Sequence, residues 1–170
     1  MLFILIGDNN TGKTTVQKLL IDKLCGYRYA RLPVNLQGPI NHTDIKRKYR
    51  TISFGNRSYQ EKKPLYKTVD NYFKNHFKDA DIAFISSHLV PADIEEMIRN
   101  GQQRFFNVTG IFFSNSIDHN RTVNEQIAAL AWHERLLIEN DWIKADRIGK
   151  QLNAITDQLV TVLISRTSIS

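Results

Sequence analysis

The sequence predicts an α/β domain with a mainly parallel sheet of four or five strands and helices on both faces. Short apolar runs typical of strands alternate with segments of helical periodicity along most of the chain. The first run, Leu2–Ile6, is apolar throughout, as in a strand buried on both faces of a sheet. The 170 residues, of which 42% are hydrophobic, suit a single domain over 1–170 with its own core.

The first half of the chain is expected to hold two strands and two helices. After Leu2–Ile6, apolar residues at helical spacing predict a helix over 14–25, which Gly26 would end. A second strand is expected within 27–36. Residues 41–63 have no clean period and are expected to form a short helix and loops. A helix should begin at Pro64, because proline suits the first helical position, and run to about residue 77.

The second half continues the alternation. Strands are expected over 81–87 and 105–113, separated by a helix over 91–100 that Gly101 would end. Thr122 and Glu125 have the spacing of a capping box for a helix running to about Trp142. A last helix is expected over 148–162. Residues 160–164 are also rich in β-formers, so a short final strand is the alternative there.

Composition narrows the class of protein. No apolar run is long enough to span a membrane, and the N-terminus lacks the pattern of a signal peptide. The single cysteine, Cys25, has no partner for an internal disulfide and matches no metal-site spacing. We therefore expect a cytoplasmic protein without a membrane partner. The sequence does not indicate its oligomeric state.

A basic segment, residues 41–67, carries all of the formal net charge of +6. It holds two acids, Asp44 and Glu61, and eight basic residues: Lys46, Arg47, Lys48, Arg50, Arg57, Lys62, Lys63 and Lys67. Such a block favours an anionic partner, either a phosphorylated small molecule, a nucleic acid or an acidic protein, although a solvated surface is the ordinary alternative. Its aromatic residues could stack on bases or cover the core.

One motif indicates a specific chemistry. Residues 7–14, Gly-Asp-Asn-Asn-Thr-Gly-Lys-Thr, fit the pattern G-x-x-x-x-G-K-[ST] between a buried strand and a helix. Glycines let the backbone wrap a phosphate, and the following helix N-terminus favours an anion. Lys13 can reach the β- and γ-phosphates, and the Thr14 hydroxyl can bind Mg²⁺. The expected phosphate-binding residues are Gly7, Asp8, Asn9, Asn10, Thr11, Gly12, Lys13, Thr14 and Thr15.

On this motif the chain resembles the P-loop NTPase superfamily, in particular its small nucleoside- and nucleotide-kinase-like members, similar to thymidylate kinase. The resemblance implies a three-layer P-loop fold, ATP with Mg²⁺, and phosphoryl transfer to a second bound substrate. It also implies a substrate segment between the second and third strands, where the basic segment falls. An arginine-bearing lid is implied after the fourth strand, at 114–122.

The sequence differs from those kinases at two places. They carry an acid at the third loop position, where this chain has Asn9, with Asp8 one place earlier. They also end the third strand in an acid, where this chain has Ser86, Ser87 and His88. Without that acid, Mg²⁺ would be held by Thr14, the phosphates and water.

Further candidate residues each have two interpretations. Asp8 is either a general base or a residue that shapes the loop. Arg121 is either the lid arginine that stabilises the transferring phosphoryl group or a solvated residue at a helix N-terminus. His88 either touches substrate or is structural. Arg47, Arg50 and Arg57 are candidates for binding the acceptor.

The primary hypothesis is an ATP- and Mg²⁺-dependent phosphotransferase acting on a small phosphorylated acceptor, such as a nucleoside monophosphate. Lys13, Arg121 and Asp8 are its candidate catalytic residues. One alternative is a polynucleotide 5′-kinase, in which the basic segment holds a nucleic acid strand. The other is a nucleotide-binding switch with weak ATPase activity, suggested by the missing acid at the end of the third strand.

Overall fold

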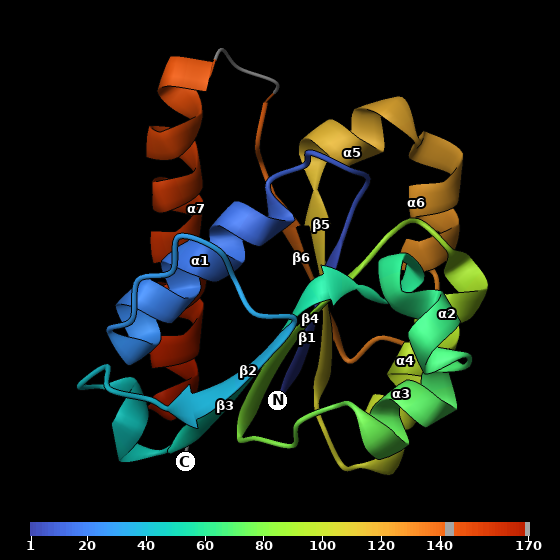
Figure 1. Cartoon of the computed structure of the whole chain (residues 1–170). Helices are drawn as coiled ribbons and strands as arrows, with labels where there is room; N and C mark the ends of the chain where they lie inside the picture. The colour runs from blue at the N-terminus through green and yellow to red at the C-terminus, as the bar shows by residue number, and fades with distance from the viewer. Residues whose placement is uncertain (142–144, 169–170) are drawn as a thin grey trace.

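The computed structural model describes residues 1–141 and 145–168 and shows one six-stranded sheet with helices on both faces (Figure 1). The strands are β1 (Leu2–Ile6), β2 (Asn35–Pro39), β3 (Thr51–Ser58), β4 (Ile82–Ser87), β5 (Val108–Phe113) and β6 (Glu134–Ile138). The helices are α1 (Lys13–Cys25), α2 (Lys63–Tyr66), α3 (Val69–Asn75), α4 (Pro91–Gln103), α5 (Ser114–His119), α6 (Arg121–Ala128) and α7 (Ala145–Thr167). Two short 3-10 helices, η1 (Ile45–Arg47) and η2 (Tyr59–Lys62), flank β3.

The sheet is parallel except at one edge. Its order is β2-β3-β4-β1-β5-β6, and only β2 runs antiparallel, against β3. The central strand β1 is fully buried because its side chains alternate between two cores. Phe3 and Leu5 pack with α1 and α7, whereas Leu2, Ile4 and Ile6 pack on the opposite face, where α3 and α4 lie. The expected buried first strand is therefore confirmed.

The connections around β1 and β4 create a crevice at one end of the sheet. The chain leaves β1 through α1 on one face and leaves the adjacent β4 through α4 on the other (Figure 1). Ligands in open α/β sheets bind at the carboxyl ends of strands whose connections diverge in this way. Residues 7–12, between β1 and α1, lie at this point.

The sheet has six strands where four or five were expected, because two strands were missed. A third strand, β2, was misplaced. β3 occupies 51–58, where loops were expected, and β2 lies at 35–39 rather than within 27–36. Gly55, which lies in the stretch without a clean period, is buried in β3, where a Cβ would meet the Tyr72 hydroxyl at 2.8 Å. β6 lies at 134–138, where a helix to about Trp142 was expected; Trp142 itself is outside the described residues.

Several helix boundaries also differ from the expectation. Gly101 does not end α4 but lies buried inside it, where a Cβ would come within 2.7 Å of Leu2. The helix expected from Pro64 is two helices, α2 and α3, separated at Lys67, which has a φ of 65°. The capping box does not form, because α6 begins at Arg121 after Asn120. Residues 160–164 belong to α7, so the alternative of a final strand is wrong.

Candidate functional site

A pocket of about 430 Å³ lies at the carboxyl ends of β1, β3 and β4. We call it the loop pocket, because one wall is the loop that joins β1 to α1 and the first turn of α1. The other walls come from the end of β3, the end of β4 and α7. It is lined by Asn9, Asn10, Thr11, Gly12, Lys13, Thr14, Thr15, Asn56, Arg57, Ser58, Glu61, Ser86, His88, Ile148 and Leu152.

The backbone N–H groups of the loop are its most distinctive feature. From Asn9 to Thr15, no backbone N–H donates a hydrogen bond to any acceptor in the described residues. The pairing stops before and resumes after this stretch, since the Asp8 N–H donates to Ser116 Oγ and the Val16 N–H to the Gly12 carbonyl. An unbroken row of donors at the start of a helix is a concentrated positive potential.

Two residues of the loop have left-handed backbone conformations. Gly12 has a φ of 102° at the N-cap of α1, and Asn10 has a φ of 64°. Two features of Gly12 disfavour a side chain. Its left-handed φ is strained for other residues, and a Cβ there would lie 2.9 Å from Leu152 Cδ2. The glycine of the motif is therefore required by backbone geometry and by close packing against α7.

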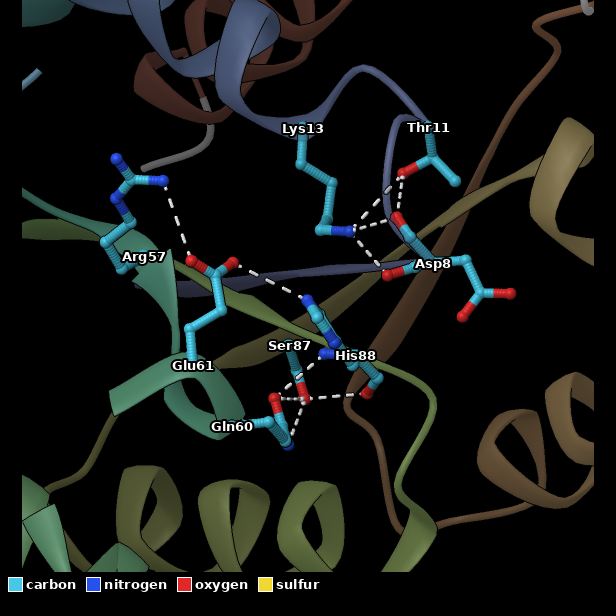
Figure 2. Close-up of polar contacts among 9 residues, drawn as sticks. Asp8, Thr11, Lys13, Arg57, Gln60, Glu61, Ser87 and His88 are labelled. Atoms are coloured by element: carbon cyan, nitrogen blue, oxygen red, sulfur yellow. Dashed lines mark hydrogen bonds and ion pairs between the residues drawn. The ribbon is translucent and has the colours of Figure 1, made fainter. Parts of the chain in front are cut away.

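Lys13 is almost completely buried, at 7% exposure, and its ammonium group lies on the loop. It donates hydrogen bonds to the Gly7 carbonyl and, at 2.6 Å, to the Asp8 carbonyl (Figure 2). Burial lowers the pKa of Lys13 to about 8, although the nearby carboxylates of Asp8 and Glu61 oppose the shift. The Lys13 ammonium is thus held against the same loop that presents the unpaired N–H groups.

The far side of the loop is tied to neighbouring elements. The Asp8 carboxylate accepts a hydrogen bond from Asn120 Nδ2 at 2.6 Å and points away from Lys13 (Figure 2). Asn140, which follows β6, donates from its amide to the Thr11 carbonyl at 3.0 Å. Of the two interpretations of Asp8, its contacts favour the one in which it shapes the loop.

Facing the loop, three side chains lie in a row in the lining of the pocket: His88, Glu61 and Arg57. His88 Nε2 lies 3.6 Å from one Glu61 carboxylate oxygen, and Arg57 lies 3.6 Å from the other (Figure 2). Burial and the positive charge of Lys13 lower the pKa of His88 despite the opposing charge of Glu61. His88 is therefore neutral at neutral pH, and Glu61 and Arg57 are the charged pair.

Gln60 fixes this wall in place. Its side-chain oxygen accepts a hydrogen bond from the backbone N–H of His88 at 3.0 Å. Its side-chain NH2 group donates to Ser87 Oγ and to the Asp93 carboxylate. These bonds join η2 to the end of β4 and the start of α4. As a result Glu61, which follows Gln60, is held at the edge of the pocket.

Ser86 is the pocket residue at the end of β4. Its hydroxyl is buried and has no hydrogen-bond partner among the described residues. Ser86 pairs with Leu5 in the parallel ladder, so its side chain lies on the α1 face of the sheet. Asp81, at the other end of this strand, instead accepts hydrogen bonds from the Arg50 and Thr51 N–H groups.

The structure brings together some of the candidate residues and not others. Arg57 and His88 line the loop pocket with Lys13 and Thr14. Arg47 and Arg50 lie before β3, at the opposite end of the sheet, because β3 runs parallel to β4. Arg121 is outside the loop pocket; it pairs with Glu125 at 3.1 Å, and its side chain is 83% exposed. We therefore leave Arg47, Arg50 and Arg121 out of the site.

The lid candidate 114–122 is not an open loop. It forms α5 and the beginning of α6, and Ser116 and Asn120 from it contact Asp8. The segment thus stabilises the loop between β1 and α1 through hydrogen bonds to Asp8.

Sequence reasoning missed Glu61, Ser86 and Asn56. Glu61 was counted only as an acid within a basic segment, and no local pattern marks it. Ser86 was noted only for the acid it replaces. Its position at the end of a predicted strand could have identified Ser86, because the carboxyl ends of adjacent parallel strands lie at one edge of the sheet.

The described residues contain no group of three or more His, Cys, Asp or Glu side chains arranged to hold a metal ion. Within the same residues, none of the helices combines the length and apolar character needed to cross a bilayer. No protein-family model matches the sequence, and no curated protein matches it.

Proposed function

We propose that the chain is a phosphotransferase of the P-loop NTPase type, which binds ATP with Mg²⁺ in the loop pocket and transfers the γ-phosphoryl group to a small phosphorylated acceptor. Residues Gly7–Thr15 would hold the triphosphate. The three-layer P-loop fold that the sequence resemblance implies is part of this proposal.

One observation carries the proposal: the uninterrupted row of unpaired N–H groups from Asn9 to Thr15, beside the buried Lys13 ammonium. Thr11 and Lys13 are buried and Gly12 is half-buried, whereas Asn9, Asn10, Thr14 and Thr15 are exposed, so the row can be reached by a ligand that supplies acceptors in place of water. A polyphosphate offers several oxygen acceptors and multiple negative charges, which suit both the N–H row and the lysine.

The position of the pocket supports the same proposal. It lies where the connections from β1 and β4 diverge, which is the usual ligand site of a parallel sheet. The apolar side chains of Ile148 and Leu152 form one wall, against which the nucleoside could pack.

The residues present fit a magnesium ion. The Thr14 hydroxyl and the unpartnered Ser86 hydroxyl both line the loop pocket, and Mg²⁺ prefers oxygen ligands and keeps several waters. When bound, the ion would neutralise phosphate charge. Because β4 ends in serines rather than in an acid, the protein ligands of the ion would be neutral hydroxyl groups.

The remaining polar residues have separate roles in transfer. Lys13 moves from the loop carbonyls to the β- and γ-phosphates, where its charge is worth more. Arg57 supplies the positive charge beside the transferring phosphoryl group. It takes this role rather than Arg121 because Arg57 lines the loop pocket and Arg121 does not. Glu61 orients Arg57 across 3.6 Å, and His88 Nε2 lies 3.6 Å from the other carboxylate oxygen of Glu61.

The polynucleotide alternative loses one of its supports. Of the aromatic residues in the basic segment, Phe54, Tyr59 and Tyr66 are buried in the core and offer no face for stacking on bases. The switch alternative makes a different prediction, since it requires nucleotide binding without turnover. The test below separates it from a phosphotransferase.

Calorimetry with ATP and excess Mg²⁺, followed by coupled measurement of ADP release with nucleoside monophosphates, tests the proposal. We expect Lys13→Ala to weaken ATP binding by about 100-fold or more and to abolish ADP release, because it removes a charge-assisted contact to the phosphates. Lys74→Ala, which removes an exposed lysine of α3, is the matched control and should change neither.

Failure to bind either ATP or GTP would refute the proposal. Tight binding without acceptor-dependent ADP release would instead favour the switch.

A further inference from the structure

A second hollow adjoins the loop pocket. It is an open groove of about 580 Å³, which we call the side groove, between the segment that joins α1 to β2 and the end of β3. Arg57 and Glu61 line both the loop pocket and the side groove. Two ligands, one in each hollow, would therefore meet at the same pair of side chains.

The side groove has a cationic side and an apolar side. Arg31, Arg57 and Lys62 are its cations, and Glu61 is the acid in its lining. Glu61 pairs with Arg57, whereas neither Arg31 nor Lys62 pairs with a carboxylate of any described residue. Tyr29 and the run Leu32–Val34 form the apolar side.

The wall formed by the α1–β2 segment is held firmly. Lys18 Nζ donates to the Ala30 carbonyl at 2.7 Å, and Asn56 donates from its amide to the Pro33 carbonyl at 2.8 Å. The Asn56 backbone N–H donates to the Val34 carbonyl, also at 2.8 Å. Asn56 is buried and lines the loop pocket as well, so one residue fixes the geometry of both hollows.

We propose that the side groove is the acceptor site, and that it takes a phosphomonoester carrying an aromatic ring, the chemistry of a nucleoside monophosphate. The ring packs on Tyr29 and the Leu32–Val34 wall, and the phosphate lies among Arg31, Arg57 and Lys62. This inference rests on the proposed function, because the loop pocket must hold the phosphoryl donor.

The transfer step is balanced by groups already named. An oxygen of the acceptor forms a bond to the γ-phosphorus of ATP, and the bond from that phosphorus to the bridging oxygen breaks. The electron pair of the broken bond leaves with ADP. At neutral pH the acceptor phosphate is largely a dianion, because the second pKa of a phosphomonoester is about 6, so the attacking oxygen carries no proton that must be removed.

The test measures binding to the full chain by calorimetry without ATP. The probes are AMP, GMP, CMP and dTMP, with ribose 5-phosphate lacking the ring and adenosine lacking the phosphate. At least one monophosphate should bind more tightly than both partial probes. If every monophosphate binds no better than ribose 5-phosphate, or none binds at millimolar concentration, the inference is wrong.

Two variants then locate the binding. Arg31→Ala should weaken monophosphate binding by about tenfold or more and leave ATP binding within about twofold, because Arg31 lines the side groove and is not in the described lining of the loop pocket. Tyr29→Leu should remove the advantage over ribose 5-phosphate while keeping an apolar side chain. Arg28→Ala, an exposed neighbour paired with Asp22, is the charge-matched control.

The outcomes separate the two proposals. If Lys13→Ala loses ATP but keeps monophosphate binding, both stand. If ATP binds and Arg31→Ala leaves monophosphate affinity unchanged, the side groove is not the acceptor site, although the loop pocket is still the donor site. If ATP does not bind at all, the proposed function fails regardless of what the groove binds.

Discussion

The two ends of the sheet both gather basic side chains but differ in what those side chains contact. At the amino end, the Met1 ammonium donates to the Asp81 carbonyl at 2.6 Å, and Arg166 pairs with Glu134. At the carboxyl end, Lys13 lies on neutral carbonyl groups, and Arg31 and Lys62 pair with no carboxylate of the described residues. The cations at the carboxyl end are the ones that line pockets, since Lys13 borders the loop pocket and Arg31 and Lys62 border the side groove.

The difference teaches that the net charge of a segment says little about where the charge is available. β3 runs through the middle of the basic segment 41–67 and spans roughly 25 Å at about 3.3 Å per residue. It leaves Lys46, Arg47, Lys48 and Arg50 at the amino end and Arg57, Lys62, Lys63 and Lys67 at the carboxyl end. An apparently single basic patch is therefore two.

The largest expected effect compares the glycines at the two ends of α1. Gly12→Ala should abolish measurable ATP binding, about 100-fold or more, because a Cβ there meets Leu152 at 2.9 Å and the φ is 102°. Gly26 also has a left-handed φ, 76°, but a Cβ there meets nothing within 4 Å. Gly26→Ala should lower the free energy of unfolding by only about 1 kcal/mol and leave ATP binding intact.

Calorimetry and chemical denaturation of both variants would measure this contrast. Equal ATP affinities in the Gly12 and Gly26 variants would contradict a phosphate role for the loop.

An intermediate effect compares basic residues from the two halves of the segment 41–67. Arg57→Ala should lower kcat about 10- to 100-fold with little change in ATP affinity, because Arg57 faces the transferring group. Lys46→Ala removes an exposed charge at the amino end and should leave kcat unchanged. Steady-state kinetics with a nucleoside monophosphate would decide; similar losses in both variants would point to a general electrostatic effect.

The smallest expected effect concerns stability at the amino end. Burial disfavours the Asp81 carboxylate, but hydrogen bonds from the Thr51 and Arg50 N–H groups outweigh it and keep its pKa below the ordinary 3.8. Its contribution is therefore present above that pH and is lost as the pH falls through the lowered pKa. Asp81→Asn should lower the free energy of unfolding by about 1 kcal/mol at pH 7, with ATP binding unchanged.

Chemical denaturation between pH 7 and about pH 2 would follow this effect, and the two proteins should become more alike in stability at the acid end. A difference that grows on acidification would contradict the assignment.

The sequence was sufficient to predict the parts of the fold that repeat a simple pattern. β1, α1 and β4 follow from a continuous apolar run, a helical period and a second apolar run. β3 could not be found in this way, because Gly55 and Asn56 resemble a turn and their burial depends on Tyr72, Gln17 and a loop elsewhere in the chain. Tertiary contacts overrode local propensity there.

The candidate site divides along the same line. The motif at 7–14 is contiguous, so the sequence predicts its residues together, and residues 9–14 line the loop pocket. Glu61 and Ser86 approach it only because β3 and β4 end beside β1. Arg121 was expected from its place after a strand, but its side chain pairs within α6, which no spacing rule distinguishes from a side chain facing the pocket.

The way in which the α1–β2 segment is fastened has an evolutionary consequence. Every bond described for it ends on a main-chain oxygen, those of Ala30, Pro33 and Val34. Any amino acid supplies such an oxygen, so, under the proposed function, substitution of Arg31 would change the acceptor site without removing a bond that fastens the segment. Descendants of this chain could exchange one metabolite for another while inheriting the same donor chemistry.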